Sequence, residues 1–263
     1  MRDLDALIDH IDQPHIDSDA ELEITRFFPD VDQDTALAVQ IGVKRRREAG
    51  GDRIVGHQAS FTSPGVRTMF PDSPAPMVGT LLASLMRNSG DTVPLDAPSV
   101  FIESEIGVVL KRDLEGPMLT HADILAAIEG FLPVIEVAPL REAVKDRKFS
   151  WNHMIAVQKA FGGYIVVGGK MTSPKGFDPR LEGCVVHLGG EARAGATGFE
   201  AMGSPLNVLA AMARKLYAVG EKLRAGQIVI TGSLPAPQVV RPGDRDAMLE
   251  FQTLGRVSIC FER

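Results

Sequence analysis

The sequence predicts an α+β protein that is built on a large, rolled and mostly antiparallel sheet. Short runs rich in Val, Ile and Phe, which are typical of strands, outnumber the segments with helical spacing. The helical segments are scattered along the chain, whereas a doubly wound sheet would alternate them regularly with strands. The chain has 263 residues, of which 44% are hydrophobic, so it can bury one large core.

The composition excludes several classes of function. The 28 basic and 34 acidic residues give a net charge of −6, which disfavours nucleic acid as the main partner. No apolar run is long enough to cross a bilayer, and the first residues lack a basic segment followed by an apolar one. Cys184 and Cys260 lie in strand-like apolar runs, so we expect both to be buried free thiols. Together these features predict a soluble protein in the reducing cytoplasm.

The first segment with clear helical spacing follows an acidic, weakly periodic N-terminus. Asp32 or Asp34 can cap this helix, and the pair Gly50-Gly51 ends it. We therefore expect residues 1–52 to form a smaller N-terminal helical lobe and residues 53–263 to form the main domain.

The main domain begins with residues 54–63, a short strand that runs into a polar, hydroxyl-rich loop. The prolines of residues 64–79 predict irregular chain, which in a compact domain often forms a lid over a site. Residues 80–88 predict a short helix. Later helices are expected after the N-caps Thr120 and Ser204. The remaining strands are expected at residues 100–110, 131–137, 162–169, 183–189, 227–233 and 255–261.

Three glutamates in strand-like runs are the strongest candidates for a site. Glu103 and Glu105 lie two residues apart and project to the same face of their strand, and Glu136 lies in a second apolar run. Carboxylates buried side by side repel each other and lose hydration, and a bound divalent cation would offset this cost. The alternative is that Glu103 and Glu105 lie on the solvent face of an edge strand and that Glu136 pairs with an arginine.

A ligand set made only of oxygen atoms suits Mg²⁺ or Mn²⁺ and argues against zinc, which favours His and Cys ligands. Such an ion would bind a small 2-oxo acid through its carboxylate and keto oxygens and would stabilise an enolate. Other constellations are weaker, since the sequence has no phosphate loop, no nucleophile elbow and no His-Glu-x-x-His motif. His57 and His153 are the most interesting histidines, and a structural role is the alternative for both.

The order of these motifs resembles the branch of 2-keto-4-pentenoate hydratases and 4-oxalocrotonate decarboxylases in the fumarylacetoacetate hydrolase superfamily. The resemblance runs from about residue 53 to the C-terminus and rests on Glu103-Ser-Glu105, Asp113-Leu-Glu-Gly-Pro117, Val134-Ile-Glu136, Gly195–Gly198, Gly203-Ser-Pro-Leu-Asn207, Leu223–Ser233 and Pro242-Gly243-Asp244. It implies a rolled, mixed β-sandwich and a Mg²⁺ or Mn²⁺ ion held by Glu103, Glu105 and Glu136. It also implies 2-oxo acid substrates, since the superfamily includes hydratases, decarboxylases and C–C hydrolases.

The chain departs from that branch where proton transfer is expected. The branch has a lysine in the segment that corresponds to Gly56–Ser63, and here Gln58 replaces it. Glutamine cannot act as a general base or as a cation. Met77 stands where the branch has an acid. His57, Lys159 or Asp72 would then have to take over proton transfer. The candidate catalytic residues are His57, Gln58 and Lys159, and the candidate substrate-binding residues are Ser60, Thr62, Ser63 and Ser233.

The resemblance implies a metal-dependent lyase, either a hydratase or a decarboxylase, that acts on a 2-oxo or 2-hydroxydienoic acid in the catabolism of aromatic compounds. A decarboxylase depends less on a placed base, which would suit the missing lysine. One alternative is a hydrolase that cleaves a C–C bond in an acylpyruvate-like substrate. Another is a diverged relative that keeps the metal and binds a ligand without catalysis. We expect a homo-oligomer whose partner is a small 2-oxo acid, without nucleic acid or membrane partners.

Overall fold

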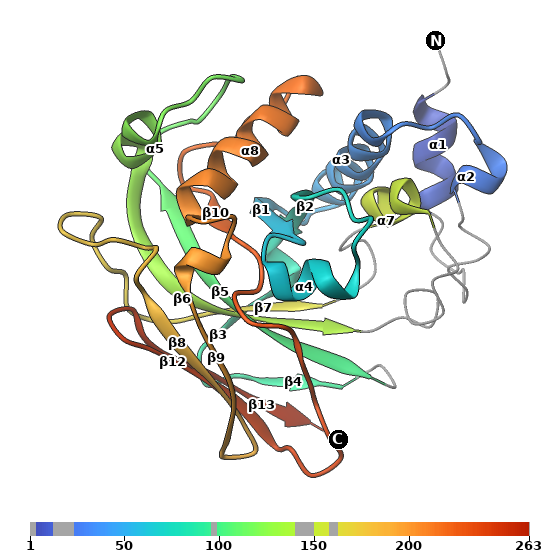
Figure 1. Ribbon diagram of the computed structural model, residues 1–263. Helices are drawn as coiled ribbons and strands as arrows, with labels where there is room; N and C mark the ends of the chain where they lie inside the picture. The colour runs from blue at the N-terminus through green and yellow to red at the C-terminus, as the bar shows by residue number, and fades with distance from the viewer. Residues whose placement is uncertain (1–3, 13–23, 96–98, 140–149, 158–162, 263) are drawn as a thin grey trace.

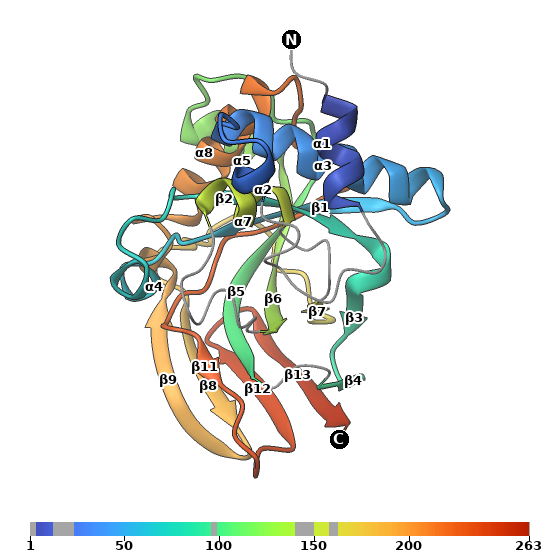
Figure 2. The ribbon, with the colours of Figure 1, turned by 90° about the vertical axis from the view of Figure 1, so that its right-hand side faces the viewer.

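The computed structural model describes residues 4–12, 24–95, 99–139, 150–157 and 163–262. Two sheets form its body (Figures 1 and 2). The 8-stranded sheet contains β1 (Ile54–Ser60), β2 (Met77–Leu82), β3 (Met86–Asn88), β5 (Val100–Leu110), β6 (Ile128–Pro139), β7 (Tyr164–Val167), β10 (Ile228–Ile230) and β11 (Gln238–Val239). The 5-stranded sheet contains β4 (Thr92–Pro94), β8 (Gly183–Leu188), β9 (Glu191–Thr197), β12 (Asp246–Phe251) and β13 (Gly255–Glu262).

Most neighbouring strands in both sheets are antiparallel. The larger sheet has the order β2-β1-β10-β5-β6-β7-β3, with β11 alongside β5, and the smaller sheet has the order β4-β13-β12-β8-β9. Among the described strands, only the pairs β1–β10, β3–β7 and β4–β13 are parallel. The long strands β5 and β6 curve as they cross the molecule (Figure 1). The prediction of an α+β fold with a rolled, mostly antiparallel sheet is therefore confirmed.

The larger sheet is buried on both faces where β5 and β6 cross it. On one face Ile102, Ile106 and Val108 of β5 join the main core, which also contains residues of the smaller sheet such as Leu249 and Ile259. On the other face lies a second apolar cluster of Leu81, Val134, Ile165, Ile228 and Ile230. Burial on both faces explains why these strands appear in the sequence as continuous apolar runs.

The α-helices in the described ranges are α1 (Leu4–Ile11), α2 (Ile24–Phe27), α3 (Gln33–Ala49), α4 (Pro64–Met69), α5 (His121–Ala127), α7 (Trp151–Val157) and α8 (Pro205–Ala218). Three of them begin at capping residues that the sequence predicts. Asp32 caps α3 by accepting a hydrogen bond from the backbone of Thr35 at 2.8 Å. Thr120 forms a capping box with Asp123 at α5, and Ser204 caps α8. None of the helices in the described ranges is long and apolar enough to cross a membrane.

Three local predictions are wrong. Residues 80–88 are helical only in the short 3-10 turn Ala83–Leu85, because β2 and β3 occupy the rest and pairing with β1 buries every residue of β2. Residues 64–79 are less irregular than expected, because α4 lies at their start and β2 begins before their end. Both cysteines are free thiols, but only Cys184 is buried, since Cys260 lies at an outward position of β13.

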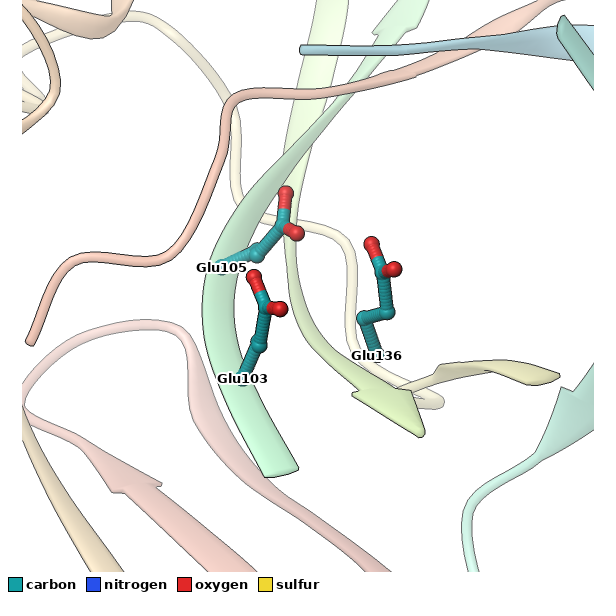
Figure 3. A group of neighbouring side chains, drawn as sticks. All are labelled: Glu103, Glu105 and Glu136. Carbon is teal, nitrogen blue, oxygen red and sulfur yellow. The ribbon is translucent and has the colours of Figure 1, made fainter. Parts of the chain in front are cut away.

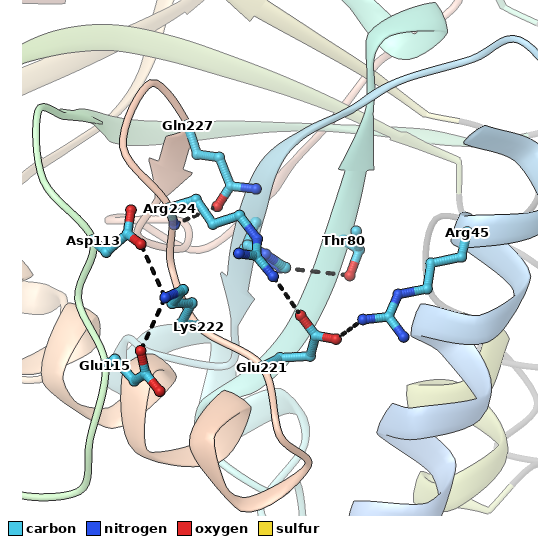
Figure 4. A network of polar contacts seen from close by, with 9 residues as sticks. Arg45, Thr80, Asp113, Glu115, Glu221, Lys222, Arg224 and Gln227 are labelled. Carbon is cyan, nitrogen blue, oxygen red and sulfur yellow. Dashed lines mark hydrogen bonds and ion pairs between the residues drawn. The ribbon is translucent and has the colours of Figure 1, made fainter. Parts of the chain in front are cut away.

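The N-terminal helices lie at one end of the molecule (Figure 1). α7 comes from much later in the chain but packs against α2 and α3, so residues 1–52 do not form this helical group alone. A chain of ion pairs joins α3 to the main domain: Arg45 contacts Glu221, which lies 3.4 Å from Arg224 (Figure 4). The division of the chain at residue 52 stays a prediction.

Gln40 on α3 joins the helical group to the larger sheet. Its fully buried side chain donates to the backbone oxygens of Val78 at 3.1 Å and Ile155 at 2.5 Å, and it accepts from the backbone N–H of Thr80 at 2.9 Å. Gln40→Leu would leave three buried backbone groups without these bonds. We expect it to lower the free energy of unfolding in urea by about 2–4 kcal/mol. Gln33→Leu, at an exposed position of the same helix, is the control, and an equal effect of both would contradict this role.

Candidate functional site

Glu103, Glu105 and Glu136 lie side by side on two neighbouring strands. Glu103 on β5 stands directly opposite Glu136 on β6, and Glu105 lies two residues further along β5 on the same face. Each residue offers one carboxylate oxygen to a group whose members all lie within 4.8 Å of one another. Figure 3 shows the three side chains on the same side of the two strands, with their carboxyl groups close together.

The three carboxylates are largely withdrawn from water. Glu105 is fully buried and Glu136 is 5% exposed, whereas Glu103 is half-buried. The apolar Val134 is the register partner of Glu105, and Ile165 is that of Glu136. β5 lies between β10 and β6 in the middle of the sheet, so the alternative of a solvent-facing pair on an edge strand is wrong.

Burial and repulsion act together on Glu105. Burial, followed by the neighbouring carboxylates of Glu136 and Glu103, raises the pKa of Glu105 well above its ordinary value. One hydrogen bond opposes this shift, since the backbone N–H of Gly232 donates to Glu105 Oε2 at 2.6 Å. The other oxygen, Oε1, is buried and has no hydrogen-bond partner in the part of the chain that the structure describes.

These features fit a hard divalent cation. Three carboxylate oxygens converge, and an oxygen-only set is the one that Mg²⁺ and Mn²⁺ prefer. The buried and unpaired Oε1 of Glu105 is available as a ligand atom, and a cation would balance the charge of three partly desolvated carboxylates. The structure thus brings together the three glutamates that the sequence proposed as metal ligands.

Gln58 lies on the same face of the sheet as the carboxylates. It pairs with Ile230 on β10, and Ile230 pairs with Gly107 on β5, two residues beyond Glu105. The side chain is 1% exposed, and its Nε2 lies 3.4 Å from Ser60 Oγ. Its Oε1 has no hydrogen-bond partner among the described residues. The amide is therefore a buried polar group that can still bind a ligand.

His57 points to the opposite face, because adjacent residues of a strand alternate. Its register partners are Thr80 and Val229, and its Nδ1 lies 3.4 Å from Thr80 Oγ1. Burial, with a smaller contribution from Arg224, lowers the pKa of His57 to about 4, so the ring is neutral at pH 7. The structure therefore does not bring this candidate catalytic residue to the carboxylates.

The lowered pKa of His57 predicts a pH dependence of stability. Between pH 6.5 and 4 the unfolded chain binds a proton here that the folded protein does not bind, so the free energy of unfolding falls as the pH falls. The loss across this window is about 3 kcal/mol. We expect His57→Asn to remove this part of the pH dependence in urea unfolding at pH 7 and pH 4.5. The same substitution at exposed His121 is the control. If the free energy of unfolding of His57→Asn changed with pH as much as that of the parent, the prediction would be wrong.

Comparison with known proteins identifies the family. Residues 54–261, most of the chain, match the family model described as fumarylacetoacetate (FAA) hydrolase C-terminal. The chain belongs to the fumarylacetoacetate hydrolase family. The resemblance expected from the motifs is confirmed, and the helices α1, α2 and α3 precede the matched residues.

Relatives in the fumarylacetoacetate hydrolase family include lyases. The chain is 33% identical to the 2-keto-4-pentenoate hydratase of Paraburkholderia xenovorans (strain LB400), over 82% of this chain and 80% of the relative. It is 31% identical to a 4-oxalocrotonate decarboxylase of Pseudomonas putida, over 97% and 96% of the two chains. The 4-oxalocrotonate decarboxylase from Pseudomonas putida G7, complexed with magnesium and adipate, has a TM-score of 0.84 at 30% identity, covering 98% of this chain and 97% of that chain. The prediction of the family's rolled β-sandwich is therefore confirmed, and these names agree with the predicted lyase-type enzyme.

The three serines expected to bind substrate differ in the hydrogen bonds that their hydroxyls can still form. Ser60 lies within hydrogen-bonding range of Gln58. Ser63 is fully buried, and its Oγ has no hydrogen-bond partner within the described ranges. Ser233 donates its hydroxyl to the backbone oxygen of Pro235 at 2.8 Å, so toward a ligand it can act only as an acceptor.

Thr62 was expected to bind substrate, but its hydroxyl forms a hydrogen bond within the protein. The side chain is 3% exposed, and its hydroxyl donates to the backbone oxygen of Thr231 at 2.8 Å. The next residue, Gly232, donates its backbone N–H to Glu105 and was missed as a functional residue, because a glycine has no side chain that would mark it in the sequence.

The remaining candidates are Lys159 and His153. Lys159 lies outside the described residues. His153 on α7 is 1% exposed, and its Nδ1 accepts a hydrogen bond from the backbone of Ile24 at 3.3 Å. This contact joins α7 to α2, so His153 takes the structural role that was the alternative for it.

Proposed function

We propose that this protein is a metal-dependent lyase that acts on a 2-oxo or 2-hydroxydienoic acid in the breakdown of aromatic compounds. The observation that carries this proposal is the group of three converging carboxylates, whose most buried member has an unpaired oxygen. The names of the relatives, a 2-keto-4-pentenoate hydratase and a 4-oxalocrotonate decarboxylase, support the substrate class. We propose Mg²⁺ or Mn²⁺ as the ion, and the similar decarboxylase structure that contains magnesium supports this choice.

Glu103, Glu105 and Glu136 would hold the ion on the same face of the sheet as Gln58. When bound, the ion supplies Lewis acidity toward the carboxylate and oxo oxygens of the substrate. The neighbouring apolar side chains of the second cluster exclude water, which strengthens the electrostatic interactions of these carboxylates. The amide of Gln58 has N–H donors and an oxygen acceptor that can orient a substrate oxygen, but it has no proton to transfer at neutral pH.

Gln58 favours decarboxylation over hydration. Hydration of a dienol requires delivery of a proton to carbon, and a positioned acid or base typically contributes about 10²–10⁴-fold to such a step. In decarboxylation of a 2-oxo-3-enoic acid whose second carboxylate is on the saturated carbon next to the C=C bond, the C–C bond to that carboxylate breaks and CO₂ leaves. The electron pair moves through the conjugated chain to the 2-oxo oxygen, and one proton from water gives the neutral enol. The bond-breaking step therefore does not need a protein base.

We propose that Gln58, Ser60 and Ser63 contact the substrate. The buried and unpaired Gln58 Oε1 and Ser63 Oγ support this assignment, because each has hydrogen-bonding capacity that the described protein groups do not use. Ser233 can contribute only as an acceptor. Lys159 stays a candidate for proton transfer. His57 is not included, because its ring lies on the other face of the sheet.

The test compares two substrates with the same purified protein. A 4-oxalocrotonate solution and a 2-hydroxypent-2,4-dienoate solution are incubated with the protein and Mg²⁺ or Mn²⁺, and their ultraviolet absorbance is followed. We expect CO₂ release from the first substrate, its dependence on the added ion, and slower loss of the second. Consumption of neither substrate with either ion would contradict the proposal. Cleavage of an acylpyruvate in place of both would favour the C–C hydrolase alternative.

We also propose that the protein works as a homo-oligomer in the cytoplasm. Two free thiols support a reducing compartment. Large exposed apolar side chains, among them Met118, Leu181 and Phe199, support an interface between copies. Light scattering of the purified protein measures its mass, and a monomer at all concentrations would contradict the oligomer.

A further inference from the structure

One peptide group lies between Thr62 and Glu105. The peptide bond that joins Thr231 to Gly232 is planar, so its C=O and N–H point in opposite directions. The C=O of Thr231 accepts the hydroxyl of Thr62 at 2.8 Å, and the N–H of Gly232 donates to Glu105 Oε2 at 2.6 Å. With a hydrogen bond at each end, the rotation of this peptide is fixed, and with it the direction of the N–H that reaches the carboxylate.

The backbone around this peptide is attached to β5 on both sides of Glu105. The hydroxyl of Thr231 donates to the backbone oxygen of Ile106 at 3.1 Å. The backbone N–H of Leu234 donates to the backbone oxygen of Ser104 at 2.9 Å. Three consecutive residues of β5 therefore accept hydrogen bonds from the same short segment, and the carboxylate is the middle one.

Gly232 has no room for a side chain. Its φ is +90°, a conformation that favours glycine. A Cβ at this position would lie 2.0 Å from Thr62 Oγ1 and 3.1 Å from the backbone oxygen of Ala59. Thr62 therefore packs directly against the glycine whose peptide it orients, and Thr62 and Thr231 are both buried.

We propose that Thr62 and Gly232 are positioning residues for metal binding. The Thr62 hydroxyl orients the Thr231–Gly232 peptide, whose N–H holds Oε2 of Glu105 and leaves Oε1 directed to the ion. This inference rests on the proposed metal site and adds the groups that hold its most buried ligand. Loss of a hydrogen bond that orients a metal ligand typically weakens metal binding about 10- to 100-fold.

Thr62→Val tests the first link, because valine keeps the shape of threonine and lacks the hydroxyl. We expect its affinity for Mn²⁺ alone, measured by titration calorimetry, to fall about 10- to 100-fold. Thr62→Ser keeps the hydroxyl and is expected to bind Mn²⁺ within about threefold of the parent, since the orienting bond is retained. Urea unfolding of the metal-free variants records the change in stability separately. Parent-like Mn²⁺ affinity in Thr62→Val would overturn the role of Thr62.

Gly232→Ala tests the second link, and Gly189→Ala is its matched control. Both glycines have positive φ values, +90° and +57°, and at both a Cβ would meet a side-chain oxygen, that of Thr62 or of Asp244. Gly189 lies between β8 and β9 in the smaller sheet. We expect both substitutions to destabilise the metal-free protein, but only Gly232→Ala to weaken Mn²⁺ binding.

A double variant separates orientation from steric clash. Thr62→Ala removes the oxygen that the new Cβ at Gly232 would meet, but it also removes the orienting hydrogen bond. We therefore expect Gly232→Ala combined with Thr62→Ala to bind Mn²⁺ as weakly as Gly232→Ala alone. Recovery of parent affinity in the double variant would overturn the orienting role.

Metal binding by the parent protein shows whether a negative result contradicts this inference or the proposed function. If the parent binds neither Mn²⁺ nor Mg²⁺, the proposed metal site itself is wrong. If the parent binds Mn²⁺ and Thr62→Val binds it equally well, only the positioning role is wrong. If Gly232→Ala does not fold, the pair Thr62→Val and Thr62→Ser decides.

Discussion

Replacing Glu105 with Gln is expected to weaken Mg²⁺ and Mn²⁺ binding at least about 100-fold, because a neutral amide replaces the most buried charged ligand. The stability of the metal-free protein is expected to change in the opposite direction. The pKa of Glu105 is raised on folding, so at pH 7 its ionised form destabilises the folded state, and Glu105→Gln removes this destabilising charge. Titration calorimetry measures the first effect, and urea unfolding at pH 7 measures the gain in stability.

Glu129→Gln is the matched control for this prediction. Glu129 lies on β6, the strand that carries Glu136, but it is exposed, and its substitution removes the same charge. We expect it to leave the binding of both ions unchanged. If the variant with Gln at all three glutamates bound Mg²⁺ and Mn²⁺ as tightly as the parent, the assignment of the metal ligands would be wrong.

Gln58→Lys is expected to raise the hydration of 2-hydroxypent-2,4-dienoate about 100-fold or more, from weak or absent activity in the parent. Lysine supplies the titratable proton that glutamine lacks. Position 58 lies on the face of the sheet that carries the three glutamates, so the new ammonium group would lie on the side where the ion and the substrate are proposed to bind. The decay of the dienol's ultraviolet absorbance in the presence of Mg²⁺ measures the rate.

Gln58→Met is the control, since it keeps a long side chain at this position without a titratable proton. We expect no gain in hydration from it. A gain equal to that of Gln58→Lys would mean that the effect comes from repacking. Strong hydration by the parent itself would also contradict the argument, because a titratable side chain at position 58 would then not be needed.

The sequence predicted those parts of the fold whose signals lie within a few neighbouring residues. Asp32, Thr120 and Ser204 marked helix starts because a capping side chain bonds to backbone groups within a few residues. The prediction of a helix at residues 80–88 was wrong because strand pairing is not a local signal. The apolar residues of this segment fit either structure, and pairing with the distant β1 selected the strand. β9 was also not predicted, since its small residues lack the branched side chains that mark strands.

By itself, the sequence indicated the family through the order of its motifs. It also proposed the three glutamates: a spacing of two on an apolar strand places Glu103 and Glu105 on one face, and Glu136 lies in a second apolar run. Only the tertiary structure decided that β5 is a central strand, that Glu136 stands opposite Glu103, and that His57 faces away from them. The partners of the site come from far along the chain: Glu105 and Gly232 are 127 residues apart, and Thr62 and Thr231 are 169 residues apart. Local periodicity carries no information about such contacts, since they form only when the sheet brings distant segments together.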